Sequence, residues 1–228
     1  MKRMGRFVSV VAVAGCGAAA ASAALTPQAE LTAMHNAAYS KNSVHYVAVN
    51  SEPGSSVRMV CDVGRGRGIQ RVTVTRDGQT GSARVIVYRH SVFIKGTAFG
   101  MRSFFGFSSM QSTKYANRWI FVPYASTAFA ALSDGATFGS FLGSLFPPSQ
   151  LSLVKAGSLI GVRGIAHRDG LTEVETLYAP AHGTPLPVKA TTTFKGQTGT
   201  DRSTMSLWNE AVPITVPADA IPLSVVTG

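Results

Sequence analysis

Cysteine is scarce in this sequence, which has Cys16 and Cys61 and no others in 228 residues. Cys16 lies in an N-terminal segment with the pattern of a leader, so a disulfide framework in the folded part of the chain is excluded. Cys61 stands on the apolar side of a predicted strand, where a lone cysteine typically behaves as a small hydrophobic residue. We therefore expect Cys61 to be a buried free thiol.

Recognisable catalytic and metal-binding patterns are also missing. The glycine-rich segment 64–68 lacks the Lys-Ser/Thr of a nucleotide loop and lies between predicted strands. A nucleophile built from Cys61, a histidine and an aspartate has no visible partners. We expect no enzyme activity, no cofactor and no metal site. The histidines are scattered singly along the chain, at His35, His45, His90, His167 and His182.

Charge is sparse and mostly positive. Charged residues make up 14% of the chain, with 21 Lys and Arg against 11 Asp and Glu, for a net charge of +10. Loss of a leader with Lys2, Arg3 and Arg6 would lower this value by three, to +7. A basic exported protein suits anionic lipid headgroups or wall polymers. No Lys/Arg block with interleaved aromatics is present, so nucleic acid is not expected as a partner.

The N-terminus predicts export. A basic stretch (1–6) precedes a short apolar run (7–15) that is too short to span a bilayer. The run ends in Val-Ala-Gly-Cys (13–16), a lipobox pattern that makes Cys16 the acylated first residue of a lipoprotein on the outer face of the cell membrane. The alternative is cleavage after Ala-Ser-Ala (21–23), which gives a secreted protein. We expect residues 1–25 to be signal peptide and tether, and 26–228 to form a single domain.

Residues 44–95 predict five short strands in an antiparallel meander. Apolar side chains recur at every second position, the period of a strand with one apolar face. Turn-forming residues separate the runs, at 64–68, 77–81 and 89–91. Before the meander, residues 27–40 predict an amphipathic helix that starts with Thr26-Pro27. The alternating apolar residues include Val57, Met59, Cys61, Val63, Val72, Val74, Val85 and Val87.

A helical insert at about 97–148 is expected to cover the apolar face of this sheet. Ten of the twelve phenylalanines lie between Phe93 and Phe146, and Asp134 is the only charged residue from 119 to 154. Large apolar residues recur at helical spacing from Phe138 to Leu145. These side chains either fill the concave side of the sheet or line a cavity there. A transmembrane hairpin is disfavoured because prolines and Asp134 interrupt every candidate span.

Strand patterns resume after residue 158. Short β-type runs are expected at 159–167, 171–178, 188–194, 205–209 and 214–216. The sheet should therefore have nine to eleven strands, interrupted once by the helical insert. This arrangement predicts the α+β class.

Three segments resemble the LppX/LprG-type actinobacterial lipoproteins and the wider LolA-like group. Leu-Tyr-Ala (177–179) precedes Gly-Thr-Pro-Leu-Pro-Val-Lys (183–189), and the aromatic stretch 207–217 closes with Val-Pro-Ile-Thr-Val-Pro. Residues 114–123, with Tyr115, Trp119 and Pro123, look like the insert of secreted relatives. The similarity covers roughly residues 40–220.

The resemblance implies a strongly curved antiparallel sheet, a half-barrel, with helices over its concave face and an apolar cavity between them that takes acyl chains. The implied function is a lipid-binding or lipid-transfer lipoprotein, with a lipid or glycolipid ligand and a membrane reached through the lipid anchor. The alternative is a non-enzymatic envelope protein with a filled core that binds a partner protein or wall polymer. The expected cavity residues are Val57, Met59, Val72, Val74, Val85, Val87, Phe138, Phe141, Leu142 and Leu145.

The lipobox predicts the behaviour of a Cys16→Ala variant. Without the thiol no acyl group can be attached, so the variant should leave the membrane fraction and lose acyl label. Cell fractionation and metabolic labelling with a fatty acid would measure both. A wild-type chain that begins at Ala24 by intact-mass analysis would contradict the lipobox interpretation.

Overall fold

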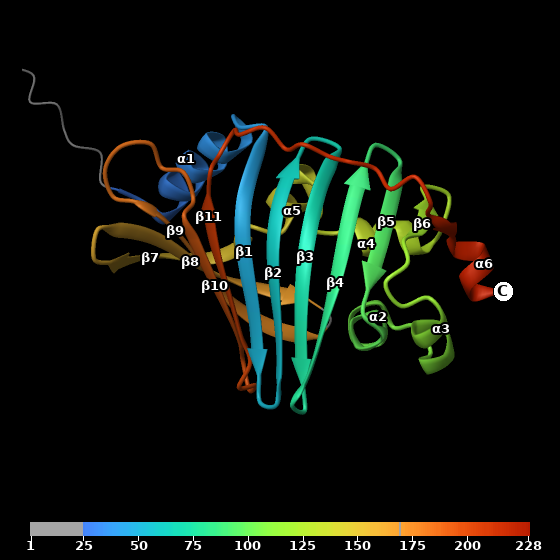
Figure 1. Cartoon of the computed structure of the whole chain (residues 1–228). Helices are drawn as coiled ribbons and strands as arrows, with labels where there is room; N and C mark the ends of the chain where they lie inside the picture. The colour runs from blue at the N-terminus through green and yellow to red at the C-terminus, as the bar shows by residue number, and fades with distance from the viewer. Residues whose placement is uncertain (1–24, 169) are drawn as a thin grey trace, which may run out of the picture.

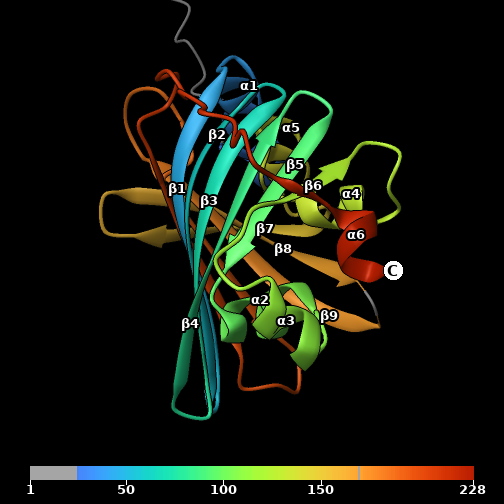
Figure 2. The same cartoon turned by 45° about the vertical axis from the view of Figure 1, so that its right-hand side comes forward.

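The computed structural model describes residues 25–168 and 170–228. Cys16 and the lipobox lie outside these residues. Within the described residues one 12-stranded sheet, mostly antiparallel and not closed on itself, is accompanied by six helices. Strands β7–β9 curl behind β1–β4 (Figure 1; Figure 2). The predicted α+β class with a curved antiparallel sheet is confirmed.

The first half of the sheet is the predicted five-strand meander. Tight turns connect its neighbours, and Gly54, Gly66 and Gly78 occupy the turn positions with positive φ. Each strand pairs with the next over almost its whole length. The prediction is confirmed for β1 (Ser43–Glu52), β2 (Ser55–Gly64), β3 (Arg67–Arg76), β4 (Gln79–Tyr88) and β5 (Ser91–Gly96).

The second half is another meander, and here the sequence prediction is partly wrong. The run at 214–216 is not a strand, and an unpredicted strand covers 149–156. The run expected at 205–209 is displaced, because the strand there covers 200–206. This extra strand lies at the sheet edge, where it pairs with one neighbour and is only partly buried, so its apolar alternation is weak. The strands are β7 (Ser149–Ala156), β8 (Leu159–Arg168), β9 (Leu171–Pro180), β10 (Lys189–Phe194) and β11 (Thr200–Ser206).

The two meanders join through β1 and β11. Their register runs from His45 opposite Ser206 to Ser51 opposite Thr200. The strand order is β12-β6-β5-β4-β3-β2-β1-β11-β10-β9-β8-β7, where β6 is Ile120–Pro123 and β12 is Ile221–Pro222. The meanders therefore meet in the middle of the sheet; β7 forms one edge, and β6 and β12 continue from β5 to the other. The chain must therefore pass from β6, next to one edge, to β7 at the other.

The part of the helical insert that follows β6 makes this passage across the concave face. The insert also contributes β6 to the sheet, and together with β7 and β12 this strand raises the total to twelve, above the expected nine to eleven. Phe138, Phe141 and Leu142 of the insert pack against Tyr46, Cys61 and Leu177 of the sheet in one core cluster. The elements are α2 (Ala98–Phe105), α3 (Ser109–Lys114), β6 (Ile120–Pro123), α4 (Ala128–Ser133) and α5 (Phe138–Gly143).

The N-terminal helix α1 (Pro27–Tyr39) completes this core. The Thr26 side chain accepts a hydrogen bond from Ala29 N at 3.2 Å, and proline begins the helix, as predicted. The buried residues Leu31 and Met34 join the cluster formed by the insert and the sheet. No helix among residues 25–168 and 170–228 is long and apolar enough to cross a membrane.

The C-terminal segment is a strap that runs along the strand ends to the far edge of the sheet (Figure 1). Ile214 and Ala220 of the strap pack against Ile69, Ile86 and Phe93. The chain then forms β12 (Ile221–Pro222), parallel to β6, and α6 (Leu223–Thr227).

Close approach of the insert to the sheet predicts a large cost for Gly68→Ala. A Cβ at Gly68 would lie 2.0 Å from the carbonyl oxygen of Ala136, so insert and sheet would have to separate. We expect the free energy of unfolding to fall by at least about 1–3 kcal/mol in urea titrations. The control is Gly139→Ala, where a Cβ meets nothing within 4 Å. Equal stability of the two variants would contradict the close contact.

Candidate functional site

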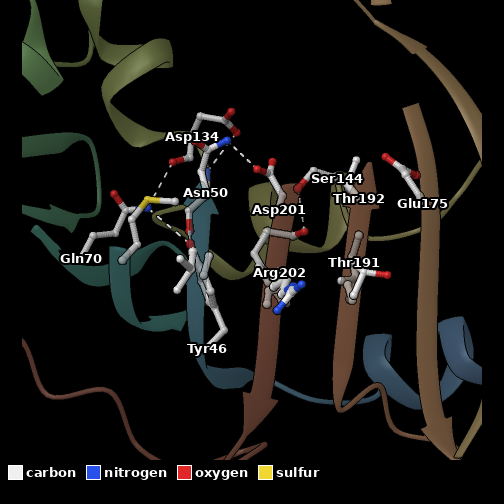
Figure 3. Close-up of a pocket in the computed structure, with 18 of the residues that line it drawn as sticks. Tyr46, Asn50, Gln70, Asp134, Ser144, Glu175, Thr191, Thr192, Asp201 and Arg202 are labelled. Atoms are coloured by element: carbon white, nitrogen blue, oxygen red, sulfur yellow. Dashed lines mark hydrogen bonds between the residues drawn. The ribbon is translucent and has the colours of Figure 1, made fainter. Parts of the chain in front are cut away.

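A cavity of about 550 Å³ lies between the concave face of the sheet and the insert. Its floor comes from strands β1, β2, β3, β9, β10 and β11, and its roof from α2, α4 and the α5 region. Among the residues that line this space, Figure 3 shows Asn50 and Asp201 on two neighbouring strands and Glu175 on the strand beyond that of Thr192. The cavity therefore exists because the two meanders pair and the insert bridges them.

The register sorts the floor into two rows. Residues directly opposite in an antiparallel pair share a face, so Glu175, Thr192, Asp201 and Asn50 form a polar row across four strands. The neighbouring row is smaller and more apolar, with Ala190, Ser203, Ala48 and Met59. The floor thus changes from polar to apolar within two residues along each strand.

The roof is largely apolar and aromatic. Phe104 and Phe105 come from α2, Leu132 from α4, and Phe141 and Leu145 from the α5 region. The helix α5 starts in a capping box, in which the side chains of Thr137 and Ser140 bond each other's backbone N–H. The cap fixes the residue at which the helix begins. It thereby fixes the side of the helix on which Phe141 lies, which is the side that packs on the sheet.

Hydrogen bonds tie the α4–α5 connection to the sheet. The hydroxyl of Tyr46 donates to the carbonyl of Gly135 at 2.7 Å, and Gln70 Nε2 lies 3.4 Å from the Asp134 carbonyl. The Tyr46 ring also stacks on Phe141, with the centroids 4.5 Å apart. Sheet and roof are therefore joined by directional bonds as well as by apolar packing.

Cys61 lies in this region as a buried free thiol, as predicted. Burial raises its pKa to about 12, so the thiol stays protonated at neutral pH. His45 and Asp62 bond each other at 2.7 Å, but strand alternation places them on the opposite face of the sheet from Cys61. The sheet therefore separates Cys61 from this histidine and aspartate, which could otherwise have completed a nucleophile system.

Carboxylates lie on the floor of the cavity. Glu173 and Glu175 are 9% and 6% exposed. Burial raises the pKa of Asp201, and the negative charges of Glu173 and Glu52 raise it further, while a hydrogen bond from Asn50 opposes the shift. Perturbed carboxyl groups of this kind gather at functional sites more often than elsewhere. The carboxyl oxygens on the floor can accept hydrogen bonds from a ligand that carries hydrogen-bond donors.

Three of the ten residues expected in a cavity line this one: Met59, Phe141 and Leu145. The others pack in core clusters, either beneath α2 or between the insert and the sheet. They are Val57, Val72, Val74, Val85, Val87, Phe138 and Leu142.

The polar row is the part that sequence reasoning missed. The sequence pattern that indicates it is alternation along β9. Glu173 and Glu175 stand at every second position, on the same face of the strand as the buried Leu177 and Ala179. A carboxylate on a buried face is rare unless it is paired or functional, so this alternation could have pointed to the site.

A second cavity of about 350 Å³ adjoins the first. Phe105, Ala131 and Leu132 line both, so these side chains form the partition. Leu223 and Thr227 of α6 also line the second cavity. No group of side chains in residues 25–168 and 170–228 has the composition of a metal site.

Two solved structures are similar to this chain over most of its length. LprF from Mycobacterium bovis is 16% identical, with 85% of this chain and 97% of that chain covered and a TM-score of 0.48. The lipoprotein LppX from Mycobacterium tuberculosis is 15% identical, with 83% and 98% covered and a TM-score of 0.47. These structures are of the lipoprotein type that the sequence resembles. No protein-family model and no curated protein match the chain.

The raised pKa of Asp201 predicts that Asp201→Asn stabilises the protein at neutral pH. The folded state holds this proton more tightly than the unfolded state, so stability falls as the pH rises through the raised pKa. The amide removes that cost and can still accept the bond from Asn50. We expect a higher free energy of unfolding at pH 7, and little change below the ordinary carboxyl pKa of 3.8.

Urea titrations at both pH values would measure the effect. Asp219→Asn, at an exposed carboxylate of the strap, is the control and should change neither value. If Asp201→Asn lowered the free energy of unfolding equally at both pH values, the prediction would be contradicted.

Proposed function

We propose that this protein is a lipid-binding lipoprotein of the cell envelope that holds acyl chains between its sheet and its insert. The observation that carries the proposal is the cavity of about 550 Å³ on the concave face. This volume lies within the range of about 300–1,000 Å³ typical of small-molecule sites. The apolar roof offers a surface against which a hydrocarbon chain can lie, formed by Phe104, Phe105, Leu132, Phe141 and Leu145.

The apolar roof can supply enough free energy for useful affinity. Each buried methylene contributes about 0.8 kcal/mol, so about ten methylenes contribute roughly 8 kcal/mol before the costs of immobilisation. The adjoining cavity offers about 350 Å³ more if the side chains of the partition rearrange. A long chain could then extend from the first cavity into the second.

The polar row favours a neutral lipid rich in hydroxyl groups. Asp201 would repel a fatty-acid carboxylate, whereas hydroxyl groups can donate hydrogen bonds to its carboxyl oxygens and to the hydroxyl oxygen of Thr192. A glycolipid or an acylglycerol has both the required donors and the chains. The headgroup would then lie against the cavity floor, and not at an outer rim.

Anchorage and transfer complete the proposal. Acylation at Cys16 would place the domain, residues 26–228, on the outer face of the cell membrane; a secreted form is the alternative. A carrier without an energy source cannot pump, so net transfer would follow from differences in lipid affinity between membranes or partner proteins.

A second candidate is a non-enzymatic envelope protein that binds a partner protein or wall polymer. It is favoured by the core clusters, which absorb most of the residues expected to line a cavity, and by the Tyr46–Gly135 hydrogen bond that holds the roof to the sheet. In this case the cavity would be a packing feature without a ligand.

A matched pair of variants on β11 separates the two functions. Ser203 lines the cavity, whereas Thr204 is exposed on the opposite face of the same strand. Ser203→Phe should fill part of the cavity and weaken binding of a fluorescent diacylglycerol by about tenfold or more, because it displaces chain volume. Thr204→Phe should leave binding unchanged.

Fluorescence titration would measure binding, and thermal unfolding of the same samples would show that both variants fold. Equal binding by both variants would rule out this cavity as the lipid site. A folded wild-type protein that binds no acyl probe would leave the second candidate.

A further inference from the structure

We propose that the convex face of the sheet docks on an anionic lipid bilayer. The face of β1–β4 turned to the viewer in Figure 1 has no element over it except the strap along one end. Strand parity places a set of basic side chains on this side of the sheet. We define this cationic face by Arg58, Arg71, Arg84, Lys95, Arg163, Lys189 and Arg202. Of these residues, Arg202 also contributes to the lining of the cavity.

The cationic face is organised in two cross-strand rows. In one row Arg71 lies opposite Arg84, and Arg84 lies opposite Lys95. In the other, Val49 lies between Arg202 on β11 and Arg58 on β2. Neighbouring strands are about 4.8 Å apart, so the positive charges spread in two dimensions over the surface.

Few negative charges balance them. Asp62 is the one carboxylate that the described strands place on this face, and it accepts bonds from Arg71 at 3.2 Å and His45 at 2.7 Å. Like charges directly opposite on neighbouring strands destabilise a sheet. Arg84 and Lys95 remain as such a pair, so an external layer of anions would relieve repulsion that the protein itself leaves in place.

An aromatic ring lies among these cations. Arg84 and Lys95 are placed over the ring of Trp119, at 5.8 and 5.7 Å from its centroid. Trp119 is partly exposed and packs on its other side with the cluster of Ile69, Ile86 and Phe93. Tryptophan next to basic residues is typical of surfaces that meet the headgroup region of a membrane.

The two-dimensional spread favours a bilayer over a linear polymer. A polyanionic chain would follow one line of cations, often along a groove, whereas fluid headgroups can distribute over both rows at once. The concave face with its cavity would then point away from the bilayer. The docking goes beyond the proposed lipid cavity and does not depend on a bound ligand, so each can fail without the other.

The test uses the full chain with Cys16→Ala, so that no acyl anchor contributes. A triple variant, Arg58→Gln, Arg71→Gln and Arg84→Gln, removes charges from three adjacent strands of the cationic face. Its control, Arg76→Gln, Lys155→Gln and Lys195→Gln, removes the same charge from exposed positions outside that face. Co-sedimentation with vesicles of phosphatidylglycerol and phosphatidylcholine, or of phosphatidylcholine alone, measures binding, with circular dichroism and thermal unfolding as checks of the fold.

We expect the Cys16→Ala chain to bind the mixed vesicles. Relative to that chain, binding should weaken about tenfold or more in the triple variant and less than about threefold in the control. Binding should also weaken in high salt and be absent with phosphatidylcholine alone. Equal binding by the triple variant and the control would overturn the proposal. Binding of polyphosphate without binding of anionic vesicles would also overturn it and would identify a polyanionic polymer as the partner.

Discussion

The pairing of β1 with β11 is the constraint on which the rest of the structure depends. It joins strands about 150 residues apart in the sequence and places two meanders side by side in one sheet. Because the other ends of the meanders lie toward opposite edges of the sheet, the connection between them has to cross a face of the sheet. The insert is this connection, and the cavity is the space left beneath it. Architecture and candidate site thus follow from one strand pair.

Strand alternation gives the two faces of the same strands different chemistry. On β11, strand alternation turns the side chains of Asp201 and Ser203 to the concave side of the sheet and that of Arg202, between them, to the convex side. On β1, it likewise turns Asn50 to the concave side and Val49 to the convex side. A one-residue shift in register would turn arginines to the concave face and carboxylates to the convex face, so the register of β1 with β11 has to be specified strongly.

The cavity combines features that oppose stability. Buried carboxylates cost free energy, and an unfilled volume loses van der Waals contacts. The surrounding clusters offset these costs: Val72, Val74 and Ala83 pack beneath α2, while Phe138 and Leu142 pack between the insert and the sheet. The structure therefore has closely packed regions around a part where polar and apolar walls meet, an arrangement that suits an amphiphilic ligand.

The sequence by itself determined those local elements whose signals are strong and lie within a few residues. Period-two alternation and turn glycines predicted β1–β5, Thr26-Pro27 predicted α1, and the spacing from Phe138 to Leu145 predicted α5. Burial of Cys61 followed from its strand parity. The tertiary structure alone decided which apolar residues fill the core and which line the cavity, since Leu142 and Phe141 are neighbours with equivalent patterns. It also decided that Glu175, Asp201 and Asn50 meet, because strand pairing over long sequence distances creates that row and no local pattern records it.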